Sequence, residues 1–465
     1  MSTLAPLPGR VAQPAAASDR PPRVAATAGA ALGVLTFVAY LPGLGRSLDF
    51  DSAQTVGMFV EPGPPWAAFT RQAVFNNHPM FSFFEQLVRV VTGSTAAATM
   101  RLLPILCGAV AVGVLTWFAA RRHGLLAGLV AGTLVAANPT FATLSRSVRG
   151  YSLLTLCAVV STVLVVRDDG RPSRRRDVAY IAVAGAGLAT HLYMAPVLAA
   201  HAGFVLAGRG LDRRWRLRFL GTLTVAALAY VGMAGPMVDG MRSHGTVFQP
   251  RLPLQFTEMV TGGRWGTVVV LPLVVAGAVL MLRRRPARGA ALALVAVLGV
   301  LWAVLQSSAL TERFFVWLVP GAAYLAAVAV ARIPVTALAV APWTAVVVVT
   351  SLLPRYTDDP TAYRVAARVI RVANAEGARS CVVAVGVPPM LAYLDPPGDF
   401  ARVDEPSQLD RCDVVVVAAW WATRDPWFEP DNRVIAAAER TFPHRTVLRH
   451  GDPTLVLSNR PLPAA

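Results

Sequence analysis

The sequence contains no lysine, so each of its 43 basic side chains is an arginine. Charge of either sign is scarce, at 15% of residues, whereas hydrophobic residues make up 55% and the mean hydropathy is +0.52. Soluble globular domains carry about 25% charged residues. This composition excludes an ordinary soluble domain, and we expect an integral membrane protein.

A basic surface of the kind that binds nucleic acid is also missing. The net charge is +17, but the arginines cluster in short loops between apolar stretches, and no basic face with interleaved aromatic residues appears. In such loops the membrane-insertion machinery reads arginine as an orientation signal. We therefore predict a membrane partner and no nucleic acid.

Cysteine is rare, and two common site motifs are absent. The four cysteines include no Cys-x-x-Cys pair, and no His-Glu-x-x-His segment occurs, so no zinc site is expected. No glycine-rich loop follows an apolar strand-like run, which argues against nucleotide binding. Cys381 and Cys412 each begin a predicted strand, and they would form a disulfide if those strands are neighbours.

Long apolar runs are abundant, and runs of about 17–22 residues are long enough to cross a bilayer as helices. The run 178–208 must be divided at His191-Leu192-Tyr193, which leaves two short halves. We predict an all-α membrane bundle of about eleven transmembrane helices, near residues 24–44, 102–120, 124–142, 151–166, 178–191, 192–208, 219–237, 267–282, 289–306, 315–331 and 335–353.

Arginines occupy every second loop, which places those loops in the cytoplasm. Residues 1–23 are then a disordered cytoplasmic lead, and residues 24–353 form the transmembrane domain of a multi-pass protein of the cell membrane. With an odd number of spans, residues 354–465 lie outside the cytoplasm. The loops 45–101, 143–150, 238–266 and 307–314 face the same outer side.

Polar residues gather at this predicted outer edge, and we interpret the edge as an active site. Asp49 and Asp51 follow the first span, Asn76 to Pro79 lie in the first outer loop, Arg146 to Tyr151 precede the fourth span, and Arg313 precedes a late one. Each residue also has a structural interpretation. Asp51 could cap a short helix, His78-Pro79 could form a turn, and Arg149 could reach lipid headgroups.

The order of these segments resembles that of polyprenyl-phosphate-sugar-dependent glycosyltransferases of the GT-C fold, the superfamily of protein O-mannosyltransferases and of the lipid A aminoarabinose transferase. The resemblance covers residues 25–355 and implies sugar transfer from a polyprenyl-phosphate donor to an extracytoplasmic glycan, lipid or protein, with mannose and arabinofuranose as the first candidate sugars. It rests on SLDFDSAQT (47–55), NNHPMFSFFEQL (76–87), SRSVRGYSLLTL (145–156), THLY (190–193) and ERFFVWLVP (312–320).

Three acidic positions of the family pattern are neutral in this chain. Ser52 stands for the usual Glu after the loop Asp, Ser147 for the Glu between the two arginines, and Asn77 for the Asp before His-Pro. A divalent ion needs hard oxygen ligands, which this loop supplies mainly through Asp49 and Asp51. We expect no cofactor and no obligatory metal, with a divalent ion as the alternative, and a non-catalytic membrane scaffold is a further alternative.

The chemistry of the expected reaction suggests roles for these residues. The leaving phosphate gains negative charge, and arginine binds phosphate oxygens in pairs, so Arg149, Arg146 and Arg313 are the candidate phosphate ligands, with Tyr151 and His78 beside them. Asp51 is the candidate general base for the acceptor hydroxyl, with Asp49 as its substitute. Direct attack opposite the phosphate would invert the anomeric centre.

A lipid or sugar transporter is the second alternative. Transporters place ionisable residues near the middle of the bilayer and often show repeated halves. Here His191 and His201 are nearly the only ionisable residues within spans, and no internal repeat is visible.

After residue 354 the composition becomes more charged and richer in proline, and we predict a small extracytoplasmic α/β domain over 354–465. CVVAV and DVVVVAA are continuous apolar runs, typical of buried parallel strands. The domain could recognise the acceptor or pack on the first outer loop. Its predicted elements are helices near 361–376 and 430–440 and strands near 381–386, 413–419, 445–449 and 454–458.

Overall fold

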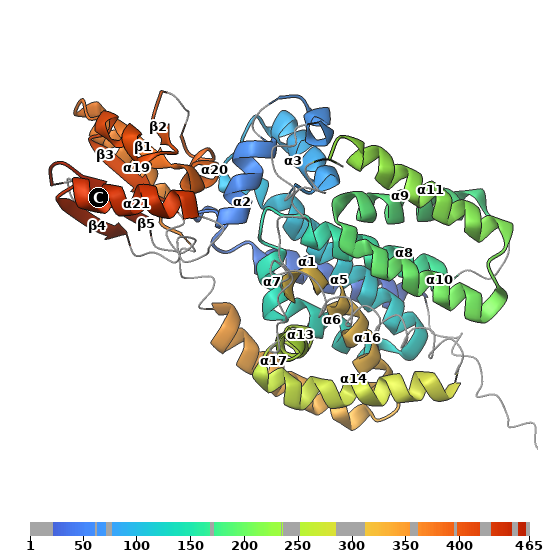
Figure 1. The fold of residues 1–465 in the computed structure, drawn as a ribbon. Coiled ribbons are helices and arrows are strands. Elements are labelled where there is room, and N and C mark those ends of the chain that lie inside the picture. Colours follow the sequence, from blue (N-terminus) through green and yellow to red (C-terminus); the bar gives the residue numbers. More distant parts are fainter. Residues whose placement is uncertain are drawn as a thin grey trace, which may run out of the picture.

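The computed structural model shows a helical bundle joined to a small α/β domain (Figure 1). It describes residues 22–60, 63–70, 77–167, 172–233, 235, 252–284, 312–353, 361–394, 398–418, 429–448 and 454–461.

The bundle consists mainly of apolar helices that overlap predicted spans, whereas α13 lies in the predicted outer loop 238–266. Of the described helical segments, Arg23–Tyr40, Ala97–His123 and Arg264–Arg284 are long and apolar enough to cross a bilayer, and five further apolar helices are shorter. The main helices are α1 (Pro22–Tyr40), α5 (Leu102–His123), α6 (Leu125–Ala136), α7 (Pro139–Leu144), α8 (Tyr151–Val166), α9 (Arg174–Thr190), α10 (Ala195–Arg209), α11 (Arg213–Tyr230), α13 (Leu252–Thr261), α14 (Arg264–Arg284), α16 (Leu318–Val330) and α17 (Ala337–Val347).

The predicted break at His191 is confirmed. Helix α9 ends at Thr190, and a short 3-10 turn, Leu192–Met194, leads into α10. The predicted span 289–306 lies outside the described residues, so the total of eleven spans stays a prediction.

Small residues let the first helices approach closely. A Cβ added to Gly29 of α1 would lie 2.6 Å from the carbonyl oxygen of Gly113 in α5, so only glycine fits there. Gly33, one turn further along α1, faces the same helix. Close backbone approach of this kind is a usual way for helices to pack in membranes, and it holds α1 against α5.

The first predicted outer loop is a set of short helices. These are α2 (Phe50–Gln54), the π-helical turn Thr55–Val60, η2 (Pro65–Phe69), α3 (Pro79–Thr92) and α4 (Ala97–Met100). Phe81 of α3 is fully buried among residues of the loop and of the C-terminal domain, whereas Leu87, on the same helix, is exposed.

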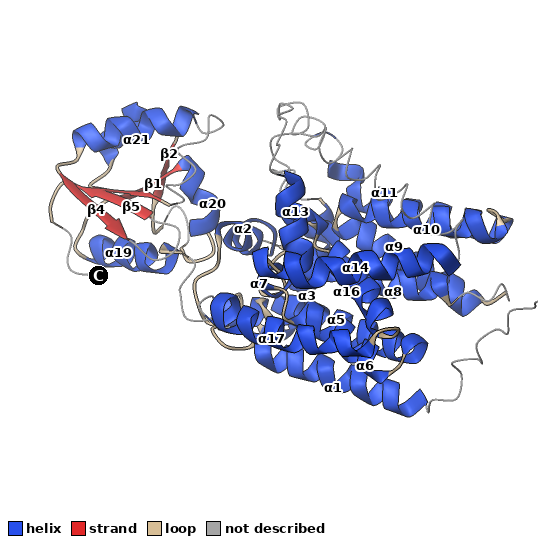
Figure 2. Ribbon diagram, turned by 90° about the horizontal axis from the view of Figure 1, so that it is seen from below, coloured by secondary structure: helices blue, strands red, loops and turns tan. Residues whose placement is uncertain are grey.

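The C-terminal domain is a five-stranded sheet of order β2-β1-β3-β5-β4. Helix α19 (Tyr363–Ala375) covers one face and α21 (Glu429–Thr441) the other (Figure 2). The two apolar runs form the parallel pair β1 and β3, as predicted, whereas β4 and β5 add an antiparallel hairpin. The strands are β1 (Ser380–Val383), β2 (Ala401–Val403), β3 (Val414–Val417), β4 (His444–Leu448) and β5 (Thr454–Ser458).

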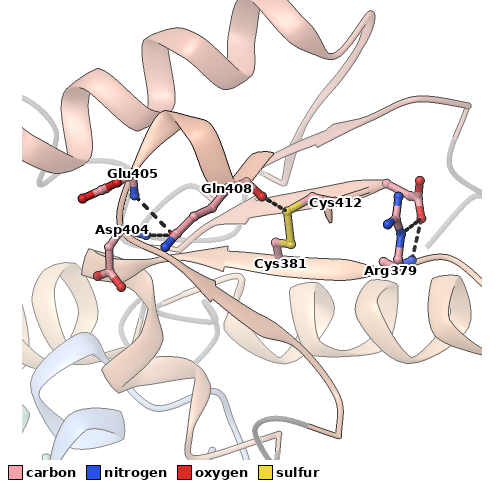
Figure 3. The surroundings of a disulfide bond; sticks show 7 residues. Arg379, Cys381, Asp404, Glu405, Gln408 and Cys412 are labelled. Carbon is pink, nitrogen blue, oxygen red and sulfur yellow. Dashed lines mark hydrogen bonds and ion pairs between the residues drawn. A yellow bond between two sulfur atoms is a disulfide. The ribbon is translucent and has the colours of Figure 1, made fainter. Parts of the chain in front are cut away.

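Burial on both faces explains why these strands are apolar throughout. Along β3, Val415 and Val417 pack with α21, whereas Val414 and Val416 pack with α19. A disulfide joins Cys381 in β1 to Cys412, just before β3 (Figure 3).

The C-terminal domain packs directly on the first outer loop. The hydroxyl of Thr361 donates to the carbonyl oxygen of Leu48 at 2.8 Å, and the amide of Leu48 donates to the hydroxyl of Tyr393 at 2.7 Å. Helix α20 (Val387–Met390) lies against α2. The domain and the loop therefore lie on the same side of the membrane.

Candidate active site

An ion pair between Asp51 and Arg313 lies at the centre of the predicted edge. Asp51 is in α2, Arg313 is in the 3-10 turn η5 (Glu312–Phe315), and Nη1 of Arg313 lies 2.7 Å from Oδ2 of Asp51. Burial lowers the pKa of Arg313, but the neighbouring Tyr151 and Asp51 raise it by more, so the guanidinium keeps its charge. Two residues from opposite ends of the membrane domain thus form one charged pair.

Arg149, from the turn before α8, and Tyr151, the first residue of α8, join this pair. Arg149 is only 1% exposed, and its Nη1 donates to the hydroxyl of Thr55 at 3.2 Å, one turn beyond Asp51. Tyr151 is also 1% exposed and interacts electrostatically with Arg313, Arg149 and Asp51. The structure therefore brings together a carboxylate from α2, guanidiniums from the turn before α8 and from η5, and a phenol from the start of α8.

Asp49 has a different environment from Asp51, because it caps α2. Its Oδ1 accepts from the amide of Ser52 at 2.9 Å and its Oδ2 from the Ser52 hydroxyl at 2.7 Å. Oδ2 also accepts from the Ser147 hydroxyl at 3.3 Å. Both oxygens of Asp49 thus accept hydrogen bonds that stabilise the start of α2 and its contact with Ser147.

Arg146 lies in the same turn before α8 as Arg149, but its side chain has different partners. Its guanidinium donates to the carbonyl oxygen of Pro42, just after α1. Its own carbonyl oxygen accepts from Nε of Arg101, whose remaining donors reach three carbonyl groups of the loop after α1. These contacts place Arg146 with the loop after α1, whereas Arg149 contacts Thr55, which directly follows α2.

His78 is buried next to Tyr151. Its ring lies 5.5 Å from the Tyr151 ring and 4.9 Å from that of His191, centroid to centroid. Burial, and then the charge of Arg149, holds the pKa of His78 well below its usual range, so the ring is neutral. Its Nδ1 lies 3.2 Å from the Thr190 carbonyl oxygen and must donate there, which leaves Nε2 as an acceptor.

Sequence reasoning identifies the charged residues but not the groups that hold them together. Ser52 and Ser147, which depart from the family pattern, lie with their hydroxyl oxygens 2.9 Å apart. Arg101, absent from our predicted site, supports the loop after α1. In the described part of the chain, no group of three His, Cys, Asp or Glu side chains is arranged to hold a metal ion.

Comparison with known proteins agrees with this architecture. The sequence profile of the dolichyl-phosphate-mannose-protein mannosyltransferase family matches residues 76–234. No curated protein matches the chain in sequence.

Two solved structures of ArnT from Cupriavidus metallidurans are similar over 93% of this chain and 97% of theirs. The apo form has a TM-score of 0.66 and 13% identity. The form bound to undecaprenyl phosphate has a TM-score of 0.63 and 15% identity. The archaeal oligosaccharyltransferase AglB from Archaeoglobus fulgidus, in complex with an inhibitory peptide and a dolichol-phosphate, has a TM-score of 0.54 and 11% identity over 93% of this chain and 74% of that one. The chain thus has the fold of ArnT and AglB, and the mannosyltransferase family profile matches it over residues 76–234.

Proposed function

We propose that this protein is a membrane glycosyltransferase that moves a sugar from a polyprenyl-phosphate donor to an acceptor at the outer face, with inversion of the anomeric centre. The observation that carries the proposal is the Asp51–Arg313 ion pair beside the buried Arg149. The solved relatives supply support of a second kind, because one holds undecaprenyl phosphate and another a dolichol-phosphate.

The two guanidiniums suit the leaving group. When the bond between the sugar and the phosphate breaks, negative charge grows on the phosphate oxygens, and arginine offers a fixed fork of donors to such oxygens. Arg149 is buried, and preorganised charges in a site shielded from water stabilise a transition state by several kcal/mol. Arg149 and Arg313 are the proposed phosphate ligands. Arg146, which lies with the loop after α1, is the less favourable candidate.

Asp51 is suited to removing the proton from the acceptor hydroxyl. When the donor phosphate binds Arg313, it takes the place of Asp51 as the partner of that guanidinium. The Asp51 carboxylate then accepts the proton of the acceptor hydroxyl, whose oxygen bonds to the anomeric carbon as the carbon–phosphate oxygen bond breaks. The polyprenyl phosphate leaves with the electron pair of that bond.

His78 suits a hydroxyl group better than a phosphate. Because its Nδ1 donates to Thr190, its Nε2 accepts a hydrogen bond, and neither the phosphodiester anion of the donor nor the fully ionised phosphate of the leaving group has a hydrogen to donate. We therefore assign His78 to orienting a hydroxyl of the sugar or of the acceptor. Mannose and arabinofuranose remain the first sugars to test, because of the family resemblance.

The test is Asp51→Asn, assayed for sugar transfer from synthetic polyprenyl-phosphate mannose and polyprenyl-phosphate arabinofuranose to cell-envelope fractions. Loss of a general base lowers the rate by roughly 10²–10⁴-fold. Asp404→Asn, which removes a carboxylate from an exposed ion pair with Arg402 in the C-terminal domain, is the matched control and should keep the wild-type rate. Unchanged transfer by Asp51→Asn would reject the assigned base. Absence of transfer by the wild type with any such donor would favour a scaffold or a transporter.

A further inference from the structure

Two serine hydroxyls join the start of α2 to the turn before α8. Ser52 is fully buried and Ser147 is 8% exposed. The Ser52 hydroxyl oxygen accepts from the amide of Val148 at 2.8 Å and lies 2.9 Å from the Ser147 hydroxyl oxygen. The two segments are far apart in sequence, so these contacts determine how they are placed relative to each other.

A count of hydrogens gives the direction of each bond. The single hydroxyl hydrogen of Ser52 goes to Oδ2 of Asp49, so in the contact between the serines Ser147 must be the donor. The same Ser147 hydrogen points to Oδ2 of Asp49, 3.3 Å away. The two hydroxyls, the Val148 amide and the Asp49 carboxylate therefore form a closed network, which we call the serine latch.

The serine latch lies between the groups that carry the proposed chemistry. Ser52 directly follows Asp51, and Ser147 and Val148 directly precede Arg149. The Arg149–Thr55 hydrogen bond is a second connection between the same two segments. Since backbone position fixes where a buried side chain is held, the latch sets the separation of Asp51 from Arg149.

We propose that Ser52 and Ser147 are positioning residues for sugar transfer, holding the base and the phosphate-binding arginine at their working distance. This role rests on the proposed function. The two positions at which this chain has serine instead of the acidic residues of the family pattern are in contact with each other, with their hydroxyl oxygens 2.9 Å apart.

The experiment compares Ser147→Thr with Ser147→Val, which have the same shape and differ in the hydroxyl. Ser52→Ala removes the acceptor of the Val148 amide without adding volume. Ser161→Ala is the control, because Ser161 is equally buried but bonds only within its own helix, α8. For each variant, hydrogen exchange of the peptide containing the Val148 amide is measured together with kcat and KM for the polyprenyl-phosphate donor.

We expect Ser52→Ala and Ser147→Val to exchange the Val148 amide faster than wild type and to lose about 10²-fold in kcat, the usual cost of a displacement of about 1 Å at a reacting centre, with a smaller change in KM. Ser147→Thr should retain both properties, and Ser161→Ala should match wild type. If the Val148 amide of Ser52→Ala exchanges as slowly as in wild type, the proposed hydrogen-bond network of the serine latch is wrong. Faster exchange with unchanged kcat would overturn its positioning role. The exchange measurement needs no turnover, so it separates failure of the latch from failure of the proposed activity.

Discussion

Substitution of Gly150, next to Arg149, tests whether a small displacement of the arginine lowers the rate of sugar transfer. A Cβ added there would lie 2.5 Å from Cγ2 of Thr190, 3.0 Å from Nδ1 of His78 and 3.2 Å from its Cβ. The backbone φ of −69° is ordinary, so the substitution Gly150→Ala introduces a clash without backbone strain. Carbon atoms pack at about 3.5–4.0 Å, so the turn must move by about 1 Å from Thr190.

The expected losses of transfer rate and of stability follow from this displacement. A shift of about 1 Å in a group that positions a substrate costs about 10²-fold in rate. Overpacking of a close-packed interior lowers the free energy of unfolding by about 1–3 kcal/mol. We therefore expect Gly150→Ala to fold, with a lower Tm, and to transfer sugar about 10²-fold more slowly.

The assay is single-turnover transfer by purified protein, with Tm measured on the same samples. Thr190→Ser removes the clashing methyl group and keeps the hydroxyl that donates to the Ala186 carbonyl oxygen at 2.7 Å. It should restore part of the rate of Gly150→Ala, because the contacts with His78 remain. Gly321→Ala is the control, since an added Cβ there meets no atom within 4 Å.

Two results would contradict this reasoning. A wild-type rate for Gly150→Ala would show that the position of Arg149 does not limit transfer. A slow Gly150→Ala that Thr190→Ser fails to improve would show that the clash is not the cause.

Further predictions concern stability. Burial raises the pKa of Glu85 in α3 well above its usual value, so the folded protein loses stability as the pH rises from the ordinary carboxyl range toward that raised value. The loss is about 1.4 kcal/mol for each pH unit between the pKa of Glu85 in the unfolded chain and its raised pKa in the folded protein. Glu85→Gln should remove this loss, which is checked by measuring Tm as a function of pH. Tyr393→Phe leaves the amide of Leu48 without its partner at 2.7 Å and should lower the free energy of unfolding by about 1–3 kcal/mol, measured by denaturant titration. Replacing Cys381 and Cys412 together by serine opens a loop with a sequence separation of 31 and should cost about 3–4 kcal/mol, seen as earlier melting of the C-terminal domain in calorimetry.

Local pattern is enough to predict much of the fold. The apolar runs become helices, the chain breaks at His191, and the runs that begin near Cys381 and Cys412 become the parallel pair β1 and β3. These features depend on the length and composition of one segment, so the sequence contains them directly. The sequence does not predict the short strand β2 (Ala401–Val403), because three residues with an exposed arginine give no periodic signal.

Features that depend on two distant segments are harder to predict. The charged residues of the site can be found because a carboxylate or a buried guanidinium is rare in an apolar chain. A serine gives no such signal, and the bond between Ser52 and Ser147 depends on how α2 meets the turn before α8. The sequence places Arg101 at the end of a loop, yet it is 6% exposed and donates to the carbonyl groups of Leu44, Arg46 and Ser47.

The contacts of Leu48 have a consequence for how the protein is made. Its partners Thr361 and Tyr393 lie 313 and 345 residues later in the chain. Ribosomes add about 5–20 residues per second, so roughly 15–70 s separate the synthesis of Leu48 from that of its partners. A nascent chain thus carries an immature first loop until its last hundred or so residues have reached the same compartment, and maturation of this part of the protein is among the final events of its biogenesis.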